Sequence, residues 1–403
     1  MRVTGWSAGA AAFLVLVAGL VGYRVIAPAE IATRARAPYP GVLAASPGVS
    51  GELARTPLIV DGRLRVYATK RQVWADTPID ARTENTPYWS LRRWPQQVTG
   101  VGAAGRLVVS RWDDGALIAL AADSGAVRWR VEGPGGAGGY AGRRTGAATV
   151  YRPPGLFVTA EAVIVSSAGG VSAYDPATGA PLWTDAPAAA CRTTEFVGSG
   201  FWAELVGCAD RVLRRILLRS GRALPDWPVP GAAVELLGCL PGGCAGMRAG
   251  GQAFRFAGET VSRAPGLDRP GTWLVDDLAV GPEGDGFVAR RAGSGAPQWT
   301  WSPGGASDRS PARIVAAEPG SVYLLTERHT LVVLATTDGL ERSRLPMDRS
   351  DEPARWTLGA VYARDRYIVV ERLAEHAGAG TSDPGTSDNA YYAGLRPVVL
   401  AGT

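Results

Sequence analysis

A repeated unit constrains the fold of this chain more than any other feature of its sequence. Two apolar runs separated by a short turn lead into a glycine turn and then a tryptophan, clearly in residues 106–129 and 162–183 and more weakly in 287–299 and 321–343. β-branched residues recur at alternating positions within the runs, which is typical of paired strands. The unit is therefore predicted to be a β-meander, in which consecutive antiparallel strands pair in chain order.

The spacing of the turn glycines indicates how many such units the chain holds. Successive turn glycines lie 54, 42, 74 and 44 residues apart, at Gly125, Gly179, Gly221, Gly295 and Gly339. The 74-residue interval holds two units, because a degenerate copy lies at residues 252–264. The resulting mean of about 43 residues is the length of a four-stranded propeller blade. Residues 53–403 are therefore predicted to form an all-β, eight-bladed β-propeller, or a seven-bladed one if the two terminal pieces complete a single blade.

Composition agrees with a β-rich fold that carries little net charge. Of the 403 residues, 53 are glycine and 29 are proline, which break helices, whereas hydrophobic residues make up 46% and supply ample core. Ala, Gly, Arg and Pro dominate, as expected of a GC-rich bacterial genome. The net charge of +5 comes from scattered arginines rather than from a basic run, so the sequence predicts no nucleic-acid partner.

The N-terminus predicts a connection to a membrane. Residues 5–23 contain no charged side chain, and this 19-residue stretch is close to the length that a bilayer core requires. We expect residues 1–26 to be an uncleaved signal anchor, a transmembrane helix, and the Ala/Pro-rich residues 27–52 to be a linker to the propeller. The alternative is a secretory signal cleaved near Ala27-Pro28-Ala29, which would release the protein from the membrane.

The four cysteines favour an oxidising compartment. Cys191 and Cys208 flank a hairpin-like stretch, and Cys239 and Cys244 bracket a turn sequence, so each pair is predicted to form a disulfide. Four buried free thiols are the alternative. Disulfides imply that the propeller lies outside the cytoplasm. With only two histidines in the chain, the sequence predicts neither a zinc site nor a Cys-His nucleophile pair.

The glycine-tryptophan turns resemble those of the PQQ-like (pyrroloquinoline-quinone-like) β-propeller repeat family. The resemblance rests on residues 174–183 (YDPATGAPLW), 119–129 (ALAADSGAVRW) and 291–299 (RAGSGAPQW), and it extends more faintly over the rest of the chain from about residue 53. In that family the tryptophan packs between adjacent blades. The resemblance therefore implies that four tryptophans are structural docking residues, namely Trp89, Trp129, Trp183 and Trp299.

The resemblance leads to an enzymatic and a non-enzymatic branch. Quinoprotein dehydrogenases of the family hold their quinone against a disulfide between adjacent cysteines and bind calcium through Glu, Asn and Asp, whereas this chain has no Cys-Cys pair and only two asparagines. The other branch resembles the outer-membrane protein assembly factor, from which this chain departs by lacking a lipid-attachment cysteine. We therefore expect no catalytic residue, cofactor or metal, and a scaffold that binds an envelope protein. A ligand-sensing envelope module and a quinoprotein-type oxidoreductase are the alternatives.

Two long connections are predicted to form the binding face. In a four-stranded blade, the connection to the next blade and the connection from the second to the third strand emerge on the same side of the disc. Residues 133–155 are of the first kind and residues 376–395 of the second. Both are unusually long, and they carry the Arg and Tyr side chains typical of protein-recognition surfaces. The alternative is that both are solvated insertions without a partner. The candidate binding residues are Tyr140, Arg143, Arg144, Arg152, Tyr391 and Tyr392.

Overall fold

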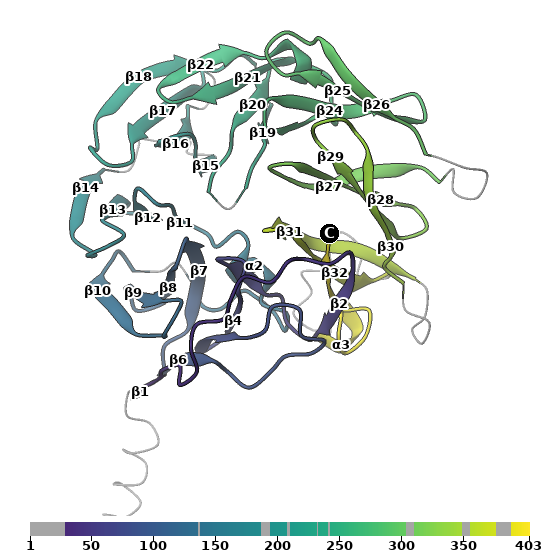
Figure 1. The fold of residues 1–403 in the computed structure, drawn as a ribbon. Coiled ribbons are helices and arrows are strands. Elements are labelled where there is room, and N and C mark those ends of the chain that lie inside the picture. The colour runs from purple at the N-terminus through teal and green to yellow at the C-terminus, as the bar shows by residue number, and fades with distance from the viewer. Residues whose placement is uncertain are drawn as a thin grey trace, which may run out of the picture.

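The strands of this chain form a ring of eight blades around a central axis (Figure 1). The computed structural model describes residues 29–135, 138–186, 194–207, 210–231, 233–240, 242–303, 310–348, 355–375 and 388–403. Within these ranges, eight separate antiparallel sheets are present, seven with four strands and one with five. The prediction of an all-β, eight-bladed propeller is confirmed, and the seven-bladed alternative is wrong.

Blades 1 to 4 follow one another in chain order, each running from an inner to an outer strand. Blade 1 consists of β3 (Leu58–Val60), β4 (Leu64–Thr69), β5 (Gln72–Asp76) and β6 (Trp89–Trp94). Blade 2 consists of β7 (Val98–Ala104), β8 (Leu107–Trp112), β9 (Ala116–Ala121) and β10 (Val127–Glu132). Blade 3 consists of β11 (Leu156–Val158), β12 (Val163–Ser167), β13 (Gly170–Tyr174) and β14 (Pro181–Asp185). Blade 4 consists of β15 (Thr194–Val197), β16 (Phe201–Val206), β17 (Val212–Leu217) and β18 (Ala223–Pro228).

Blades 5 to 8 complete the ring. Blade 5 consists of β19 (Val234–Leu237), β20 (Gly246–Ala249), β21 (Gln252–Ala257) and β22 (Thr260–Arg263). Blade 6 consists of β23 (Trp273–Val275), β24 (Leu278–Glu283), β25 (Gly286–Arg291) and β26 (Pro297–Trp301). Blade 7 consists of β27 (Ala312–Glu318), β28 (Ser321–Thr326), β29 (Thr330–Ala335) and β30 (Glu341–Pro346). Blade 8 consists of β31 (Trp356–Arg364), β32 (Tyr367–Ala374), β33 (Val398–Gly402) and β2 (Gly48–Leu53). Three short helical turns lie in connections: α2 (Ala147–Val150), η1 (Pro265–Leu267) and α3 (Asp388–Tyr391).

The two ends of the chain close the ring. β2 from the N-terminal side pairs antiparallel with β33 from the C-terminal side, with Leu53 opposite Val398. A further strand, β1 (Ala29–Thr33), pairs antiparallel with β6 and gives blade 1 its fifth strand. The structure therefore differs from the expectation that residues 27–52 are a free linker. The physical reason is that the backbone groups near both ends of this stretch are hydrogen-bonded in sheets, and backbone pairing needs no apolar side chain.

The predicted membrane segment, residues 1–26, lies outside the described residues. In the part of the chain that the structure describes, no helix has the length and apolar character needed to cross a membrane.

Each of the four repeated tryptophans contacts the blade that follows its own. The indole Nε1 of Trp89 donates to the carbonyl of Ala122 at 2.8 Å, and Trp129 donates to Pro176 at 2.8 Å. Trp183 and Trp299 make the same bond to Leu218 and Thr336, both at 2.7 Å. Every acceptor lies at the turn between the third and fourth strands of the next blade.

The turn glycine makes room for the tryptophan ring. Gly125, Gly179, Gly221 and Gly339 all have positive φ, and a Cβ on any of them would overlap the tryptophan of the preceding blade. The glycine is thus required both by the backbone conformation of the turn and by the close approach of the indole. The glycine and the tryptophan of the repeat therefore act across two neighbouring blades rather than within one.

The junction between blades 8 and 1 uses a different device. The connection from β5 to β6, residues 77–88, packs against β2, and the amide of Glu52 donates to the carbonyl of Arg82 at 2.9 Å. This connection is held in place by a fully buried ion pair, in which Arg65 contacts Asp76 at 2.7 and 2.6 Å. Arg65 also donates to two carbonyls of the same connection. A buried charge cluster therefore organises the place where the ring closes.

Candidate binding face

The base of the first long connection is held by a buried arginine. Arg111 lies in β8, is only 3% exposed, and its guanidinium points to both ends of the connection between β10 and β11. It donates to the carbonyls of Pro134 and Gly135 at one end and of Pro154 and Gly155 at the other, at 3.2 to 3.4 Å. Burial lowers the pKa of Arg111. The connection therefore starts and ends at one fixed point of the blade.

The same connection folds back toward the axis of the ring. Its short helix α2 contacts the inner strand β7 and also β4 of blade 1, and it lies near the middle of the ring in Figure 1. Tyr151 stacks on Tyr362 of the inner strand β31, with ring centroids 4.5 Å apart, and its hydroxyl donates to the carbonyl of Pro57 at 2.9 Å. The connection after blade 2 thus packs on blades 1 and 8.

The two long connections meet each other, as the blade topology predicts. Arg144 donates to the carbonyls of Gly394 and Leu395 at 2.8 and 3.1 Å. The guanidinium carbon of Arg143 lies 4.2 Å from the centre of the Tyr391 ring, and that of Arg144 lies 4.8 Å from the centre of the Tyr392 ring. Segments about 250 residues apart in the sequence are therefore joined on one face of the disc.

A buried polar cluster lies beneath this contact. The hydroxyl of Thr145 donates to Glu371 Oε1 at 2.5 Å and lies 3.1 Å from the hydroxyl of Tyr392. The second oxygen of Glu371 accepts a bond from the amide of Ala360 at 3.0 Å. Because Thr145, Glu371 and Tyr392 are all buried, these bonds link the first connection to blade 8 away from solvent.

The structure separates the six predicted binding residues into four groups. Arg143, Arg144 and Tyr391 are half-buried and lie at the junction of the two connections. Tyr392 is 3% exposed, so the expectation that it contributes to an exposed face is corrected: its ring is covered by the polar cluster and by Arg144. Tyr140 is half-buried, and its hydroxyl donates to the carbonyl of Arg143 at 2.8 Å. Arg152 is exposed, and no contact among the described residues joins it to this junction.

Sequence reasoning missed two exposed residues at the same junction. Leu395 is 74% exposed, the highest value among the large apolar residues of the described chain, and Arg396 beside it is also exposed. The signal was the loop sequence after the two tyrosines, where an apolar residue stands between glycine and arginine. We call Arg143, Arg144, Tyr391, Leu395 and Arg396 together the loop face.

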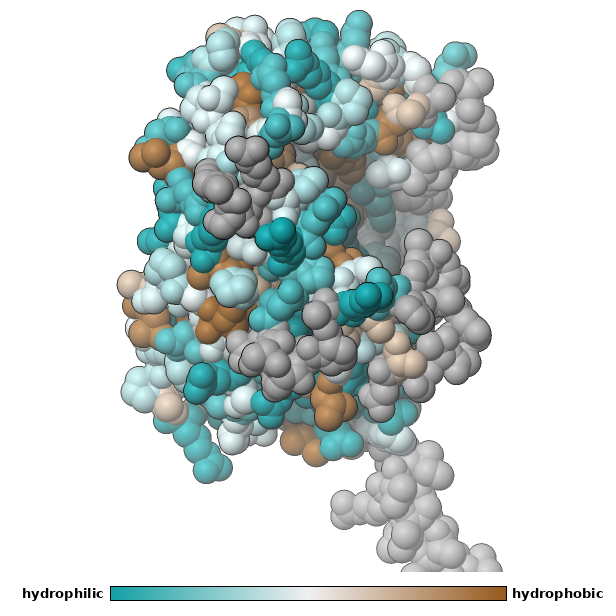
Figure 2. All heavy atoms as spheres, turned by 90° about the vertical axis from the view of Figure 1, so that its right-hand side faces the viewer, coloured by the Kyte–Doolittle hydropathy of each residue, from teal (hydrophilic) through white to brown (hydrophobic). Residues whose placement is uncertain are grey.

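The exposed apolar residues of the ring are scattered rather than gathered. Figure 2, which looks onto the right-hand side of Figure 1, shows apolar side chains in small groups separated by hydrophilic ones. Leu340, which is 67% exposed, lies in the turn between β29 and β30 of blade 7. This turn emerges on the opposite side of the disc from the loop face, which makes Leu340 a useful comparison for Leu395.

The structure describes two of the four cysteines. Cys239 and Cys244 form a disulfide in the connection between β19 and β20, where Leu240 and Gly243 also pair through their backbones. Cys191 and Cys208 lie outside the described residues, so their pairing stays a prediction.

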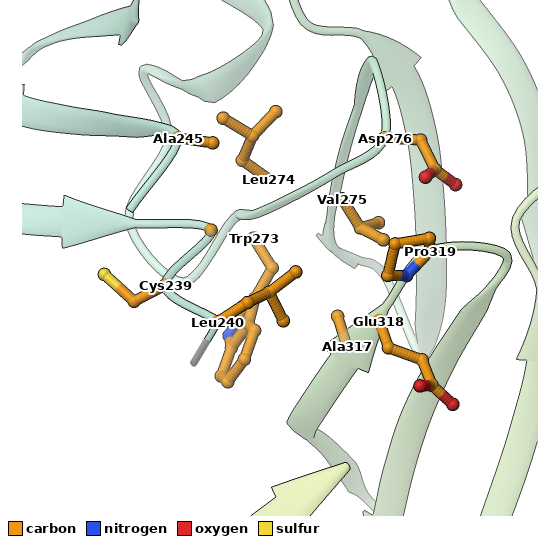
Figure 3. A pocket seen from close by; sticks show the side chains of 11 residues that line it. Cys239, Leu240, Ala245, Trp273, Leu274, Val275, Asp276, Ala317, Glu318 and Pro319 are labelled. Atoms are coloured by element: carbon orange, nitrogen blue, oxygen red, sulfur yellow. The ribbon is translucent and has the colours of Figure 1, made fainter. Parts of the chain in front are cut away.

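A small cavity lies beside the Cys239–Cys244 turn. Figure 3 shows its lining, with Leu240 and Trp273 on one side and the carboxylates of Asp276 and Glu318 on the other. Its volume is about 70 Å³, whereas sites for small organic ligands usually measure about 300–1,000 Å³. A quinone does not fit a space of this size. In the described ranges, no group of three or more His, Cys, Asp or Glu side chains is arranged to hold a metal ion.

A larger groove lies between blades 7 and 8. It measures about 410 Å³ and is lined by residues that include Arg313, Glu327, His329 and Trp356. The rings of His329 and Trp356 stack with centroids 3.9 Å apart. Both rings also bond to one carboxylate oxygen of Asp348, at 2.8 Å from His329 Nδ1 and 2.7 Å from Trp356 Nε1. Sequence patterns do not predict this aromatic wall, because its members come from the β28–β29 turn, the β30–β31 connection and the start of β31.

Together, the blades and their docking contacts define an eight-bladed β-propeller with two long connections joined on one face. Residues 79–203 match the family model described as outer membrane protein assembly factor BamB. This match spans about a third of the chain, and the glycine-tryptophan repeats within it are similar to those of the PQQ-like β-propeller family. No curated protein matches the chain in sequence.

Solved structures resemble the chain at low sequence identity. BamB from Moraxella catarrhalis is 16% identical over 86% of this chain and 92% of its own, with a TM-score of 0.41. The computationally designed Ika8 protein is 12% identical over 88% and 100%, with a TM-score of 0.45. The dihydro-heme d1 dehydrogenase NirN is 15% identical over 73% and 66%, with a TM-score of 0.42. At these values the similarities carry no argument about function.

Proposed function

We propose that this chain is a membrane-tethered, extracytoplasmic scaffold without catalytic activity, which binds a protein partner of the bacterial envelope through the loop face. The observation that carries the proposal is the junction of the two long connections. Arg144 bonds the backbone at Gly394 and Leu395, so the side chains around it are held in one arrangement before a partner arrives. Preorganised loops lose less conformational entropy on binding than free ones.

The chemistry of the loop face suits a protein partner. An exposed leucine lies beside three arginines and a tyrosine, and Arg and Tyr are enriched among the residues that dominate binding energy at protein interfaces. The family match adds support, because its description is that of an assembly factor. The face is positive, so we expect the contacting surface of the partner to carry acidic residues around an apolar pocket.

The proposed location rests on the N-terminal sequence and on the cysteines. Residues 5–23 are long enough to span a bilayer core, and the Cys239–Cys244 disulfide is of a kind that persists in oxidising compartments. Cleavage after the apolar segment remains the alternative and would give a secreted propeller. Sequencing the N-terminus of the mature protein distinguishes the two.

The test is cross-linking of the partner in intact cells. The variant Leu395→Asp with Arg396→Glu should abolish the cross-linked product, because it reverses the charge and removes the apolar contact without touching the bonds of Arg144. The matched control is Leu340→Asp with Arg342→Glu, which makes the same changes on the opposite side of the disc, at the β29–β30 turn and the start of β30, where Arg342 donates to Ser321. An unchanged product in the first variant, with the propeller still folded, would move the partner site elsewhere.

A second pair of changes separates binding from loop order. Arg143→Glu with Arg144→Glu should also abolish the product, but it removes the bonds that join the two connections as well. We therefore expect this variant to increase proteolytic cleavage within residues 138–155, whereas Leu395→Asp with Arg396→Glu should not. Loss of binding in both variants, with cleavage in only one, assigns the effect to the surface itself.

The groove between blades 7 and 8 supports ligand sensing as a second candidate function. Its volume lies within the range of small-molecule sites, and its wall combines two stacked rings with Arg313. A thermal-shift screen with a defined library of envelope metabolites should find a stabilising compound whose effect is lost in Arg313→Ala. A library without any stabilising compound would remove this candidate. For the quinoprotein alternative, we expect no quinone absorbance after incubation with pyrroloquinoline quinone and calcium.

A further inference from the structure

β1 adds its five residues to the outer edge of blade 1, so the chain N-terminal to it begins at the rim of the ring (Figure 1). Ala29 lies opposite Trp94, the last residue of β6, and Thr33 lies opposite Ser90. Glu30 fixes the strand further, because its carboxylate contacts Arg93 of blade 1 and Arg130 of blade 2. The first described residue is therefore attached at a defined point, where the outer strand ends.

The short distance along the chain brings this point close to the proposed bilayer. If residues 5–23 span the membrane, only residues 24–28 separate the span from β1. Six steps of about 3.5 Å each reach at most about 20 Å, of which the headgroup region takes roughly 5–8 Å. Because residues 29–33 are already paired with blade 1, such a span would hold the rim of blade 1 near the membrane surface.

The rim at this point carries a cluster of basic and apolar side chains. Ile31 lies opposite Arg92 across the β1–β6 pair and is 58% exposed. Arg92 is also exposed, and Trp94 follows it on the same side of the strand. The guanidinium carbon of Arg71 lies 3.5 Å from the centre of the Trp94 ring, and Lys70 beside it is exposed. We call Ile31, Lys70, Arg71, Arg92 and Trp94 the rim patch.

Backbone bonds hold the members of the rim patch together. The amide of Arg93 donates to the carbonyl of Arg71 at 3.0 Å, and the amide of Val98 donates to the carbonyl of Lys70 at 2.9 Å. The turn between β4 and β5 is thereby fixed against the end of β6. The patch is thus part of the rigid blade, and it presents three positive charges beside a tryptophan and an isoleucine.

We propose that the rim patch binds the headgroup region of an anionic lipid bilayer next to the point where the N-terminal segment enters it. Basic residues close to a membrane attract anionic headgroups, and tryptophan is enriched where one side of the ring is apolar and the other is wet. The patch has this composition at the one place on the ring that the short N-terminal connection keeps near the bilayer. This inference rests on the membrane tether of the proposed function.

Photo-cross-linking to lipid tests the proposal with the full chain reconstituted in vesicles. Benzoylphenylalanine in place of Ile31 should form a lipid adduct in vesicles of phosphatidylcholine with phosphatidylglycerol. The same probe in place of Leu340, which is similarly exposed on blade 7, should form none. Mass spectrometry of the irradiated protein identifies the adduct. A second protein chain cross-linked at position 31 in place of lipid would overturn the proposal in favour of a protein contact.

Charge reversal tests the recognition of anionic headgroups. Lys70→Glu with Arg92→Glu should reduce the adduct at position 31 severalfold, because two attractive charges become repulsive. Arg219→Glu with Arg222→Glu makes the same charge change on exposed residues of blade 4 and should leave the adduct unchanged. Circular dichroism confirms that each variant is folded. An adduct unaffected by Lys70→Glu with Arg92→Glu would overturn electrostatic binding by the patch.

Two further readouts distinguish lipid binding by the rim patch from membrane anchoring by the N-terminal segment and from partner binding by the loop face. Full chain that stays in the membrane after carbonate extraction but gives no lipid adduct at position 31 overturns the rim patch and leaves the tether intact. Full chain that carbonate releases overturns the tether, and the rim patch with it. Partner cross-linking through the loop face is measured separately in cells, so its loss affects neither result.

Discussion

Trp89 is the docking tryptophan whose removal should cost the propeller most. Its side chain is fully buried between blades 1 and 2, where Nε1 donates to the carbonyl of Ala122 and the ring covers Gly125. Trp183 makes the equivalent contacts to blade 4 but is only half-buried. The structure thus makes Trp89→Ala a sharper perturbation than Trp183→Ala, although the sequence repeats give no reason to rank them.

The expected loss follows from the packing and from the hydrogen bond. Truncation of a buried aromatic residue to alanine typically costs about 3–5 kcal/mol, because a cavity remains where the ring was. The carbonyl of Ala122 also loses its donor, at a cost of about 1–3 kcal/mol if no water replaces the indole. Trp89→Phe keeps most of the ring and loses only the donor, so it should cost roughly half as much as Trp89→Ala.

Thermal unfolding followed by near-ultraviolet circular dichroism measures these differences. A loss of about 3–5 kcal/mol should lower the melting temperature by on the order of 5 °C, because an unfolding entropy of about 2 cal/mol/K per residue in a fold of roughly 350 residues gives about 1.4 °C per kcal/mol. The melting temperature of Trp183→Ala should lie between those of Trp89→Phe and the wild type, or close to that of Trp89→Phe. An unchanged melting temperature in Trp89→Ala would show that the indole does not join the blades, and the docking interpretation would fail.

Three further predictions concern buried charge and the disulfide. Asp76→Ala leaves the guanidinium of Arg65 buried without its partner and should lower stability by about 3–5 kcal/mol, measured by chemical unfolding. Burial raises the pKa of Glu318 above its ordinary 4.5. The contribution of Glu318 to stability is therefore present below pH 4.5 and is lost as the pH rises through the folded-state pKa. In Glu318→Gln, the melting temperature should change less with pH over that window. Replacing Cys239 and Cys244 by alanine opens a short loop and should cost about 2 kcal/mol of stability relative to the oxidised wild type, measured by differential scanning calorimetry. The reduced wild type should melt at the same temperature as this variant, and a difference between the two would contradict the prediction.

The blade itself was predictable because its signals are local. Alternating apolar residues specify strands, and a glycine in the turn specifies where the third strand reverses into the fourth, so both can be read within one stretch of about 40 residues. The same connectivity correctly predicted that the described parts of the two long connections, residues 138–155 and 388–395, meet on one face. The candidate site was less predictable at the level of side chains. Tyr392 looks like a surface residue in the sequence, but it is buried: its hydroxyl lies 3.1 Å from that of Thr145, and Arg144 lies over its ring, both far away in the chain.

Closure of the ring was not predictable from the same signals. Residues 29–33 and 48–53 form short segments with little apolar character, so their local sequence does not distinguish them from the surrounding Ala/Pro-rich linker. Their strand conformation depends on pairing with the backbone edges of β6 and β33. These edges exist only in the folded blades 1 and 8. A hydrogen bond between backbones carries no side-chain signature, and for that reason sequence pattern is silent about it.

The sequence by itself determined the β-meander and its repeat length, which favoured eight blades over seven, together with the glycine-tryptophan contact that joins four of the blade pairs. Only the tertiary structure decided how the ring closes, which insertion residues become buried, and where the N-terminal segment leaves the rim. The physical reason is the range of the interactions. Turn geometry and strand alternation act within a few residues, whereas the pairing of β1 and β2, the clamp of Arg111 and the contact of Arg144 with Gly394 join segments that meet only in the folded ring.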